Sequence, residues 1–320
     1  MANISLTIAC GPYDRMEGIR SGAVQIEGID PTCVAIESPV EIFARMIKQN
    51  AFDVSEMSLT TFMSARSRNE FPFVSIPVFP SRVFRHGFIF VNSRAGIEKP
   101  RDLEGRRIGV QGYRQAASVW IRGILKDEYG VDFSGVCWVD GGGSSDQKSI
   151  PGVQIERAAG MPALSEMLAE GKIDAFMGAS APSSLGKSPN VARLFPEYRK
   201  VEREYFQRTR IFPIMHTVVI REKLYRERPW IAESLFKAFT ESKRLALRSM
   251  RFSGAMRYML PWLYDDVDEI DELFGRDPYP YGLEANRVNL ETLARYLLEQ
   301  GFVDRKIDVD GIFEPIVWKH

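Results

Sequence analysis

The sequence predicts an α/β protein of two lobes, each a mixed sheet flanked by helices. Its 320 residues are many for a single hydrophobic core. Short apolar strands alternate with amphipathic helices in the first part of the chain, and this alternation restarts at residue 93. We therefore expect a first lobe at 1–92 plus 201–320, a second lobe inserted at 93–200, and a ligand cleft between them.

Composition excludes several classes of partner. Hydrophobic residues make up 45% of the chain and aromatic residues 11%, as in a well-packed globular protein. Because 42 basic residues balance 42 acidic ones, neither nucleic acid nor an anionic membrane is an expected partner. No apolar run approaches the roughly 20 residues of a membrane span. Whether the chain forms a homo-oligomer stays open.

The N-terminal stretch and the cysteines favour a cytoplasmic location. MANISLTIACGPYDR has no basic segment followed by the apolar run of about 7–15 residues that an export signal needs. Cys10, Cys33 and Cys137 form no CxxC pair, so free thiols in a reducing compartment are expected. The three histidines show no metal-binding spacing, and we expect no cofactor.

In the first block, residues 4–10 alternate apolar and polar and predict a strand that GPYDR ends. Ser38 is the expected N-cap of the helix that follows a second strand. The remaining elements expected here are the second strand at 31–37, a strand running into a helix over 53–67, and strands at 73–80 and 83–92.

In the second block, the helix 116–129 is expected to end at Gly130, and GGGSS (141–145) reads as a flexible loop because it lacks the lysine of a phosphate loop. The other expected elements are strands at 106–110, 136–140 and 173–177, a returning strand within 210–224, helices at 228–250 and 289–302, and a solvated helical face at 265–274.

Several stretches resemble known families. DLEGRRIGV and EGKIDAFMG resemble the second lobe of type II periplasmic-binding-protein folds. More of the chain is similar to 4,5-dihydroxyphthalate decarboxylases, which are cytoplasmic enzymes built on that fold. The stretches that carry this similarity are LTIACGPYDR, VQIEGID, FPSRVFRHGFIFVN, DLEGRRIGVQGY, VWIRGILKDEYGV and DPYPYGLEANRVNLETLARYLLEQGF.

The resemblance implies a type II periplasmic-binding-protein-like fold and a cofactor-independent decarboxylase. Its implied substrate is a small hydroxylated aromatic dicarboxylate, foremost 4,5-dihydroxyphthalate, which would give protocatechuate. The alternative is a solute-binding protein or cytoplasmic sensor that binds such an anion without chemistry.

Candidate site residues in the first block follow two strands. Tyr13, Asp14 and Arg15 lie after the first strand, where spacing alone indicates an ordinary polar turn and the resemblance favours a site. Ser58 lies, with neighbouring hydroxyls, where a strand gives way to a helix, and it is expected to bind a carboxylate or to cap that helix.

Arg82, Arg85 and His86 carry charge into the stretch 80–92, which reads as a strand whose other half is apolar. Side chains alternate along a strand, so Arg82 and His86 should share one face and Arg85 should point away. An arginine among aromatic residues needs a partner, which is either a carboxylate ligand or a structural acid.

Tyr113, Arg114 and Gln115 begin the helix of the second lobe, where free N–H groups favour an anion. Arg114 departs from the family, in which we expect a Glu-Tyr-Gln run, and this changes the charge that a ligand meets. Ser180 follows the last strand of that lobe and is a candidate donor or part of a plain loop.

The acid–base residue stays open between His86 and His216, because histidine titrates near neutral pH. His216 lies on the returning strand, where a core role is the alternative. Asp14 is an alternative base.

Overall fold

The computed structural model describes residues 3–142 and 150–316, and the chain divides into two compact units. The first unit comprises Met1–Arg82, Ile214–Leu290 and Ile307–His320, and the second comprises Val83–Pro213 and Glu291–Lys306. From Gly143 onward, the loop predicted at 141–145 lies outside the described residues. Among the residues described, no helix has both the length and the apolar character that crossing a membrane requires.

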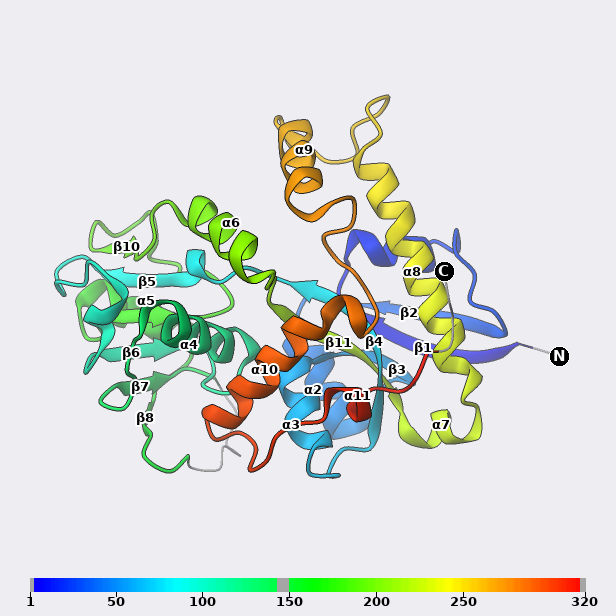
Figure 1. Ribbon diagram of the computed structural model, residues 1–320, viewed down its shortest axis with the longest axis horizontal. Helices are drawn as coiled ribbons and strands as arrows, with labels where there is room; N and C mark the ends of the chain where they lie inside the picture. Colours follow the sequence, from blue (N-terminus) through cyan, green and yellow to red (C-terminus); the bar gives the residue numbers. More distant parts are fainter. Residues whose placement is uncertain (1–2, 143–149, 317–320) are drawn as a thin grey trace. The chain divides into compact units, whose positions relative to one another are not determined.

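The first unit is built on a five-stranded sheet of order β2-β1-β3-β11-β4 (Figure 1). Strand β11 is antiparallel to both of its neighbours, and the other strands run in one direction. The strands are β1 (Ile4–Cys10), β2 (Ile29–Ala35), β3 (Val54–Ser58), β4 (Phe73–Arg82) and β11 (Ile214–Arg221). The carboxyl ends of four strands therefore meet the start of β11 at one edge.

Helices cover this sheet, and α8 contributes a row of apolar side chains to its core, among them Leu235 and Phe239. Ser38 caps α2 as predicted, because its side chain accepts from the N–H of Glu41. The helices of this unit are η1 (Asp14–Met16), α1 (Glu17–Arg20), α2 (Pro39–Gln49), α3 (Leu59–Arg66), α7 (Glu222–Glu227), α8 (Trp230–Met250), α9 (Leu263–Phe274), η4 (Glu284–Asn286) and α11 (Val309–Ile312).

The second unit is built on a six-stranded sheet of order β10-β5-β9-β6-β7-β8. Strand β5 is antiparallel to its two neighbours, and the other pairs are parallel. The strands are β5 (Ile89–Asn92), β6 (Arg107–Val110), β7 (Cys137–Asp140), β8 (Gln154–Arg157), β9 (Ala175–Met177) and β10 (Val191–Arg193). Its helices are η2 (His86–Phe88), η3 (Pro100–Leu103), α4 (Ala116–Tyr129), α5 (Met161–Glu170) and α6 (Tyr198–Thr209), and most of α10 (Arg287–Glu299) joins them.

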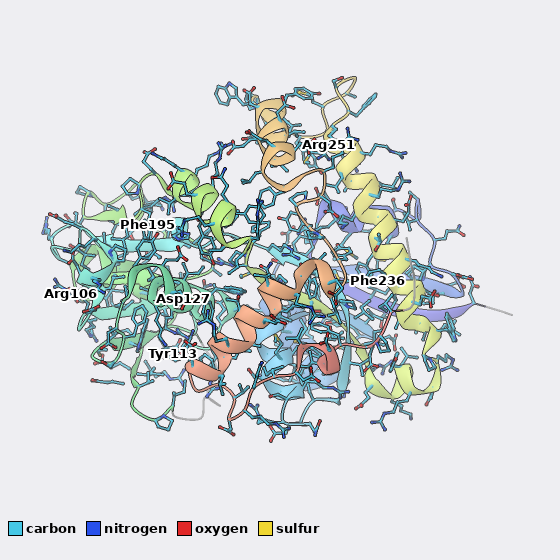
Figure 2. The ribbon with its side chains drawn as sticks, viewed as in Figure 1. Arg106, Tyr113, Asp127, Phe195, Phe236 and Arg251 are labelled. Carbon is cyan, nitrogen blue, oxygen red and sulfur yellow. The ribbon has the colours of Figure 1, made fainter. Side chains whose placement is uncertain are left out.

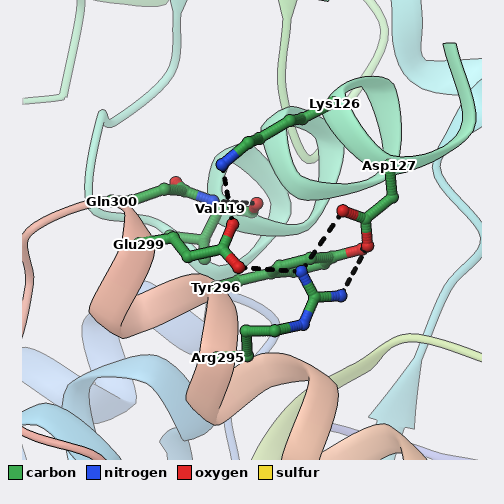
Figure 3. A network of polar contacts seen from close by, with 7 residues as sticks. All are labelled: Val119, Lys126, Asp127, Arg295, Tyr296, Glu299 and Gln300. Carbon is green, nitrogen blue, oxygen red and sulfur yellow. Dashed lines mark hydrogen bonds and ion pairs between the residues drawn. The ribbon is translucent and has the colours of Figure 1, made fainter. Parts of the chain in front are cut away.

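Polar contacts explain why residues 291–306 belong to the second unit although we expected them in the first lobe (Figure 3). Arg295 of α10 pairs with Asp127 of α4 at 2.5 Å, and Tyr296 donates to the same carboxylate at 2.7 Å. Lys126 pairs with Glu299 at 2.9 Å. The expected boundaries at 92 and 200 differ as well, because β5 and α6 pair and pack within the second unit.

The single strand expected at 83–92 is wrong. β4 continues to Arg82, the chain then leaves the sheet, and residues His86–Phe88 form a 3-10 turn before β5. The alternation argument that placed Arg82 and His86 on one face therefore does not apply, because alternation requires an unbroken strand.

Candidate functional site

A buried carboxylate organises the carboxyl edge of the first sheet. The Glu56 side chain, on β3, has no solvent exposure. Its Oε2 accepts the backbone N–H of Gly11 at 2.9 Å, and its Oε1 accepts the Tyr13 hydroxyl at 2.6 Å. The same Oε1 lies 2.5 Å from Nδ1 of His216. A buried carboxylate must be paired and hydrogen-bonded, and here the stretch after β1 and the strand β11 supply the partners.

Strand register brings His216 to Glu56. His216 stands opposite Ser58 on β3, so Glu56, two residues earlier, is its diagonal neighbour on the same face. Phe43 meets the imidazole edge-on, with ring centroids 5.0 Å apart. The imidazole is 16% exposed, so a small molecule at this edge can reach it.

Charge and hydrogen bonding set the protonation of this cluster. Burial raises the pKa of Glu56, but the charge of His216 and the hydrogen bonds from His216, Tyr13 and Gly11 outweigh it and hold the pKa below its usual value. An ionised carboxylate only accepts, so Nδ1 of His216 is the donor in this hydrogen bond. Burial, together with the Glu56 charge, raises the pKa of Tyr13, which stays a phenol.

Asp14 and Arg15 lie beside this cluster. Asp14 Oδ1 accepts from Nη1 of Arg15 at 3.0 Å, and its Oδ2 accepts the Tyr258 hydroxyl at 3.0 Å. The Arg15 guanidinium lies over the rings of Tyr13 and Tyr279, at 4.2 and 4.5 Å from their centroids. The guanidinium is therefore held in place at the sheet edge, and only 14% of its side chain is exposed.

Arg82 and Ser58 occupy more enclosed positions. Arg82 is 4% exposed, and its Nη2 donates to Asn286 and, at 3.1 Å, to the carbonyl of Pro280. Those partners belong to the chain itself, so Arg82 anchors the segment before α10. The Ser58 hydroxyl lies 3.0 Å from that of Thr60, in the first turn of α3.

His86 is enclosed in the second unit. It is 1% exposed, and within the described part of the chain neither ring nitrogen has a hydrogen-bond partner. Aromatic rings surround it, with Tyr205 at 5.2 Å and Phe195 (labelled in Figure 2) at 5.3 Å. Burial and the nearby Arg208 charge lower its pKa to about 4, so the imidazole is neutral at neutral pH.

The residues around His86 are also buried. Arg85 is 3% exposed, and its guanidinium lies 5.2 Å from the centroid of the Phe88 ring. Glu202 on α6 accepts the backbone N–H of Gly87 at 2.9 Å. Burial raises the pKa of Glu202 to about 6, against the lowering effect of the N–H groups and of Arg85.

The predicted residues 113–115 are placed by contacts within the second unit. The Tyr113 ring (Figure 2) is buried against Trp138, and the Arg122 guanidinium lies 3.9 Å from its centroid. Arg122 also donates to the Tyr113 carbonyl at 2.8 Å. The guanidinium of Arg114 lies 5.0 Å from the Phe302 ring. The side chain of Tyr113 is thus part of the core, and its backbone shapes the loop before α4.

The start of α4 carries buried polar atoms. Gln115 Oε1 and Ser118 Oγ have no hydrogen-bond partner among the described residues, and Ser118 has no solvent exposure. The first N–H groups of a helix also lack partners within the helix. Nearby, Gln111 Oε1 accepts both the Ser180 hydroxyl and the Ala179 N–H at 3.3 Å. This end of α4 combines free donors with a buried hydroxyl, a combination that suits a carboxylate.

Sequence reasoning missed Glu56, Ser118 and Tyr258. A single acid inside the buried strand VSEMS was the signal for Glu56. The positions of Ser118 and Tyr258 gave no such signal, because their contacts depend on tertiary structure. Among the described residues there is no group of three or more His, Cys, Asp or Glu side chains placed to hold a metal ion.

The fold defines the class of protein. The chain matches the periplasmic aliphatic sulphonate binding protein of Escherichia coli with a TM-score of 0.56 and 12% identity, over 100% of this chain and 94% of that one. At this identity the match concerns the fold alone, and it confirms the predicted type II periplasmic-binding-protein-like architecture.

Sequence comparison identifies the family. A 4,5-dihydroxyphthalate decarboxylase of Comamonas testosteroni is 35% identical over 323 residues, covering 98% of each chain. Another, of Pseudomonas putida, is 35% identical over 215 residues, covering 65% of this chain and 83% of that one. The family model NMT1/THI5 like matches residues 26–241. The chain belongs to the 4,5-dihydroxyphthalate decarboxylase family, as its sequence motifs indicated.

Proposed function

We propose that this protein is a carboxy-lyase that converts 4,5-dihydroxyphthalate to protocatechuate in the cytoplasm. The observation that carries the proposal is the 35% identity, over 98% of the chain, to a relative that bears this name. A proton-transfer pair, His216 and Glu56, supports it. The three free cysteines are consistent with a reducing compartment.

Decarboxylation of this substrate needs a general acid and a binding position for each of its two carboxylates. A ring hydroxyl para to a carboxyl-bearing carbon pushes electrons toward that carbon, which takes a proton. The carbon–carboxyl bond then breaks, its electron pair returns to the ring, and carbon dioxide leaves. Because the ring itself supplies the electrons, this route requires no redox or electrophilic cofactor in principle.

Residues of the first unit would perform the proton transfer. His216 would deliver the proton from Nε2, while Glu56 holds Nδ1 and fixes the orientation of the ring. Arg15 would bind a carboxylate of the substrate, and Asp14 would receive the phenol proton. Arg82 would act through the segment that it anchors, since its guanidinium already donates to Asn286 and Pro280.

In the second unit, the N-terminus of α4 is the proposed anion position. The Ser118 hydroxyl would donate to the anion together with the first N–H groups of the helix. Gln115 would contact the anion through its amide N–H₂ group, because its Oε1 only accepts. Arg114 and Ser180 would contribute to selectivity. His86 is enclosed and neutral, so we assign the proton transfer to His216 and a packing role to His86.

The test is turnover of 4,5-dihydroxyphthalate in deuterium oxide. We expect carbon dioxide and protocatechuate with one deuterium at the carbon that lost the carboxyl group. Phthalate, which lacks the hydroxyls, should bind without reacting. Binding of 4,5-dihydroxyphthalate without turnover at any pH would instead establish the solute-binding alternative.

A further inference from the structure

A cavity of about 1020 Å³ opens in the first unit between α8 and the segment 276–285. Neither Glu56 nor His216 lines it. Figure 2 labels two of its lining residues, Phe236 on α8 and Arg251 just after the end of that helix. The cavity is therefore a place for a ligand that the proposed reaction does not use.

Its walls are strongly cationic although the chain as a whole has no net charge. Six basic side chains line the cavity against two acidic ones, Glu241 and Asp277. On α8, Lys237, Arg244 and Arg248 recur at helical spacing and so share the face toward the cavity. The remaining basic residues are Lys243, Arg251 and Arg276.

Ion pairs neutralise some of these positive charges, and other basic side chains of the cavity form no ion pair with the described residues. Arg244 pairs with Glu241 at 2.6 Å, and Arg251 pairs with Asp271. Arg248 and Arg276 are both exposed and have no ion pair within the described part of the chain. Two guanidinium groups are thus available to an anion, and guanidinium matches the geometry of a carboxylate.

The same cavity has an apolar lining. Phe236, Leu247, Pro280 and Tyr281 contribute to it, and Phe236 also reaches the core. An inorganic anion would leave this apolar surface without a partner, whereas a molecule with an apolar body would cover it.

We propose that this cavity binds a small organic anion with an aromatic body and a carboxylate, at a site distinct from the Glu56–His216 pair. Arg248 and Arg276 bind the carboxylate, and the ring lies on the apolar lining. The binding does not depend on the proposed reaction.

Contacts of the segment 276–285 link this site to the sheet edge. Lys243 in the cavity wall pairs with Asp277 and donates to the Tyr279 carbonyl at 2.8 Å. The Tyr279 ring in turn lies 4.5 Å from the Arg15 guanidinium. A ligand that holds this segment in place therefore also restrains Arg15. The cavity is thus a regulatory site for a ligand bound at the carboxyl edge of the first sheet.

Calorimetric titration of the full chain with benzoate tests the proposal. The test variant is the double substitution Arg248→Ala with Arg276→Ala. The control is the double substitution Lys48→Ala with Arg226→Ala, which also removes two exposed positive charges but outside the cavity. We expect the first pair to weaken one benzoate site by about tenfold and the control to leave it unchanged. Equal binding by both variants, or binding of inorganic phosphate as tightly as benzoate, would overturn the proposal.

Hydrogen exchange separates this site from the proposed catalytic one. In the wild type, benzoate should slow exchange of the amides of residues 277–282, and this protection should vanish in Arg248→Ala with Arg276→Ala. If Glu56→Gln loses turnover but benzoate still protects residues 277–282, the cavity site is supported independently of the proposed reaction. Protection that persists in the Arg248/Arg276 double variant would contradict it.

Discussion

His216 and Glu56 are 160 residues apart in the chain, yet Nδ1 of the imidazole and Oε1 of the carboxylate are 2.5 Å apart. The pairing of β11 with β3 creates this contact. It joins a partly exposed imidazole at the sheet edge to a carboxylate that is fully buried. The proposed acid is therefore oriented before a substrate arrives.

Replacement of Glu56 by Gln tests the orienting role. The amide keeps the shape of the side chain but carries no charge, so it stabilises neither the tautomer nor the imidazolium of His216. We expect kcat for decarboxylation to fall by about 100-fold, with a small change in KM and a shifted pH profile. Tyr13→Phe, which removes one hydrogen bond to the same oxygen, should have a smaller effect. An unchanged pH profile in Glu56→Gln would contradict this role.

His86 should remain neutral well below neutral pH. Its pKa is about 4 in the folded chain against 6.5 in the unfolded chain, because burial disfavours the charged ring. The lowered pKa means that the folded state binds fewer protons between these values. The free energy of unfolding should therefore rise by roughly 3 kcal/mol from pH 4 to pH 6.5 through this group. NMR titration of the imidazole, assigned with His86→Gln, measures the pKa directly, and a value above 6 would contradict the burial argument.

Glu202 should change the free energy of unfolding with pH in the direction opposite to His86. Burial raises its pKa from 4.5 to about 6, so the folded state binds more protons in this window. Stability should consequently fall by roughly 2 kcal/mol as pH rises from 4.5 to 6. Glu202→Gln keeps an acceptor for the N–H of Gly87 and removes the titration. The variant should gain that stability relative to the wild type between these pH values, as measured by urea denaturation. Parallel stability curves would show that Glu202 has an ordinary pKa.

Gly123 of α4 lies directly against the Tyr296 ring of α10. A Cβ at this position would overlap the Tyr296 ring. Gly123→Ala should therefore destabilise the second unit by about 1–3 kcal/mol, because the ring is held by its bond to Asp127 and cannot withdraw freely. Gly135→Ala, whose Cβ would meet nothing closer than 3.7 Å, is the matched control. Equal melting temperatures of the two variants would show that α10 can shift.

Much of the fold could be predicted from local patterns. Alternation at 4–10 and the N-cap at Ser38 are short-range signals, and both predicted elements are present. The strand expected at 83–92 was wrong because its apolar residues are shared between a 3-10 turn and a short strand, which local hydrophobicity does not distinguish.

The candidate site was predictable only in part. Spacing alone indicated an ordinary polar turn at Tyr13, Asp14 and Arg15, and only the family resemblance favoured a site there. In the structure Tyr13 donates to Glu56, and Arg15 contacts both Tyr13 and Asp14. Arg82 was expected to be a ligand clamp, but its partners Asn286 and Pro280 are about 200 residues away in sequence and no local pattern reveals them.

The sequence by itself determined the α/β class and the helix caps, because these depend on short-range periodicity and on single residues at helix ends. It also determined the family, because the family's motifs can be read directly from the residues. Only the tertiary structure decided which charges are paired and which are available. Strand register buried Glu56 beside His216, and the docking of α10 onto α4 moved residues 291–306 into the second unit. Both outcomes depend on contacts between residues far apart in the chain, where burial and pairing, not local preference, set the energy.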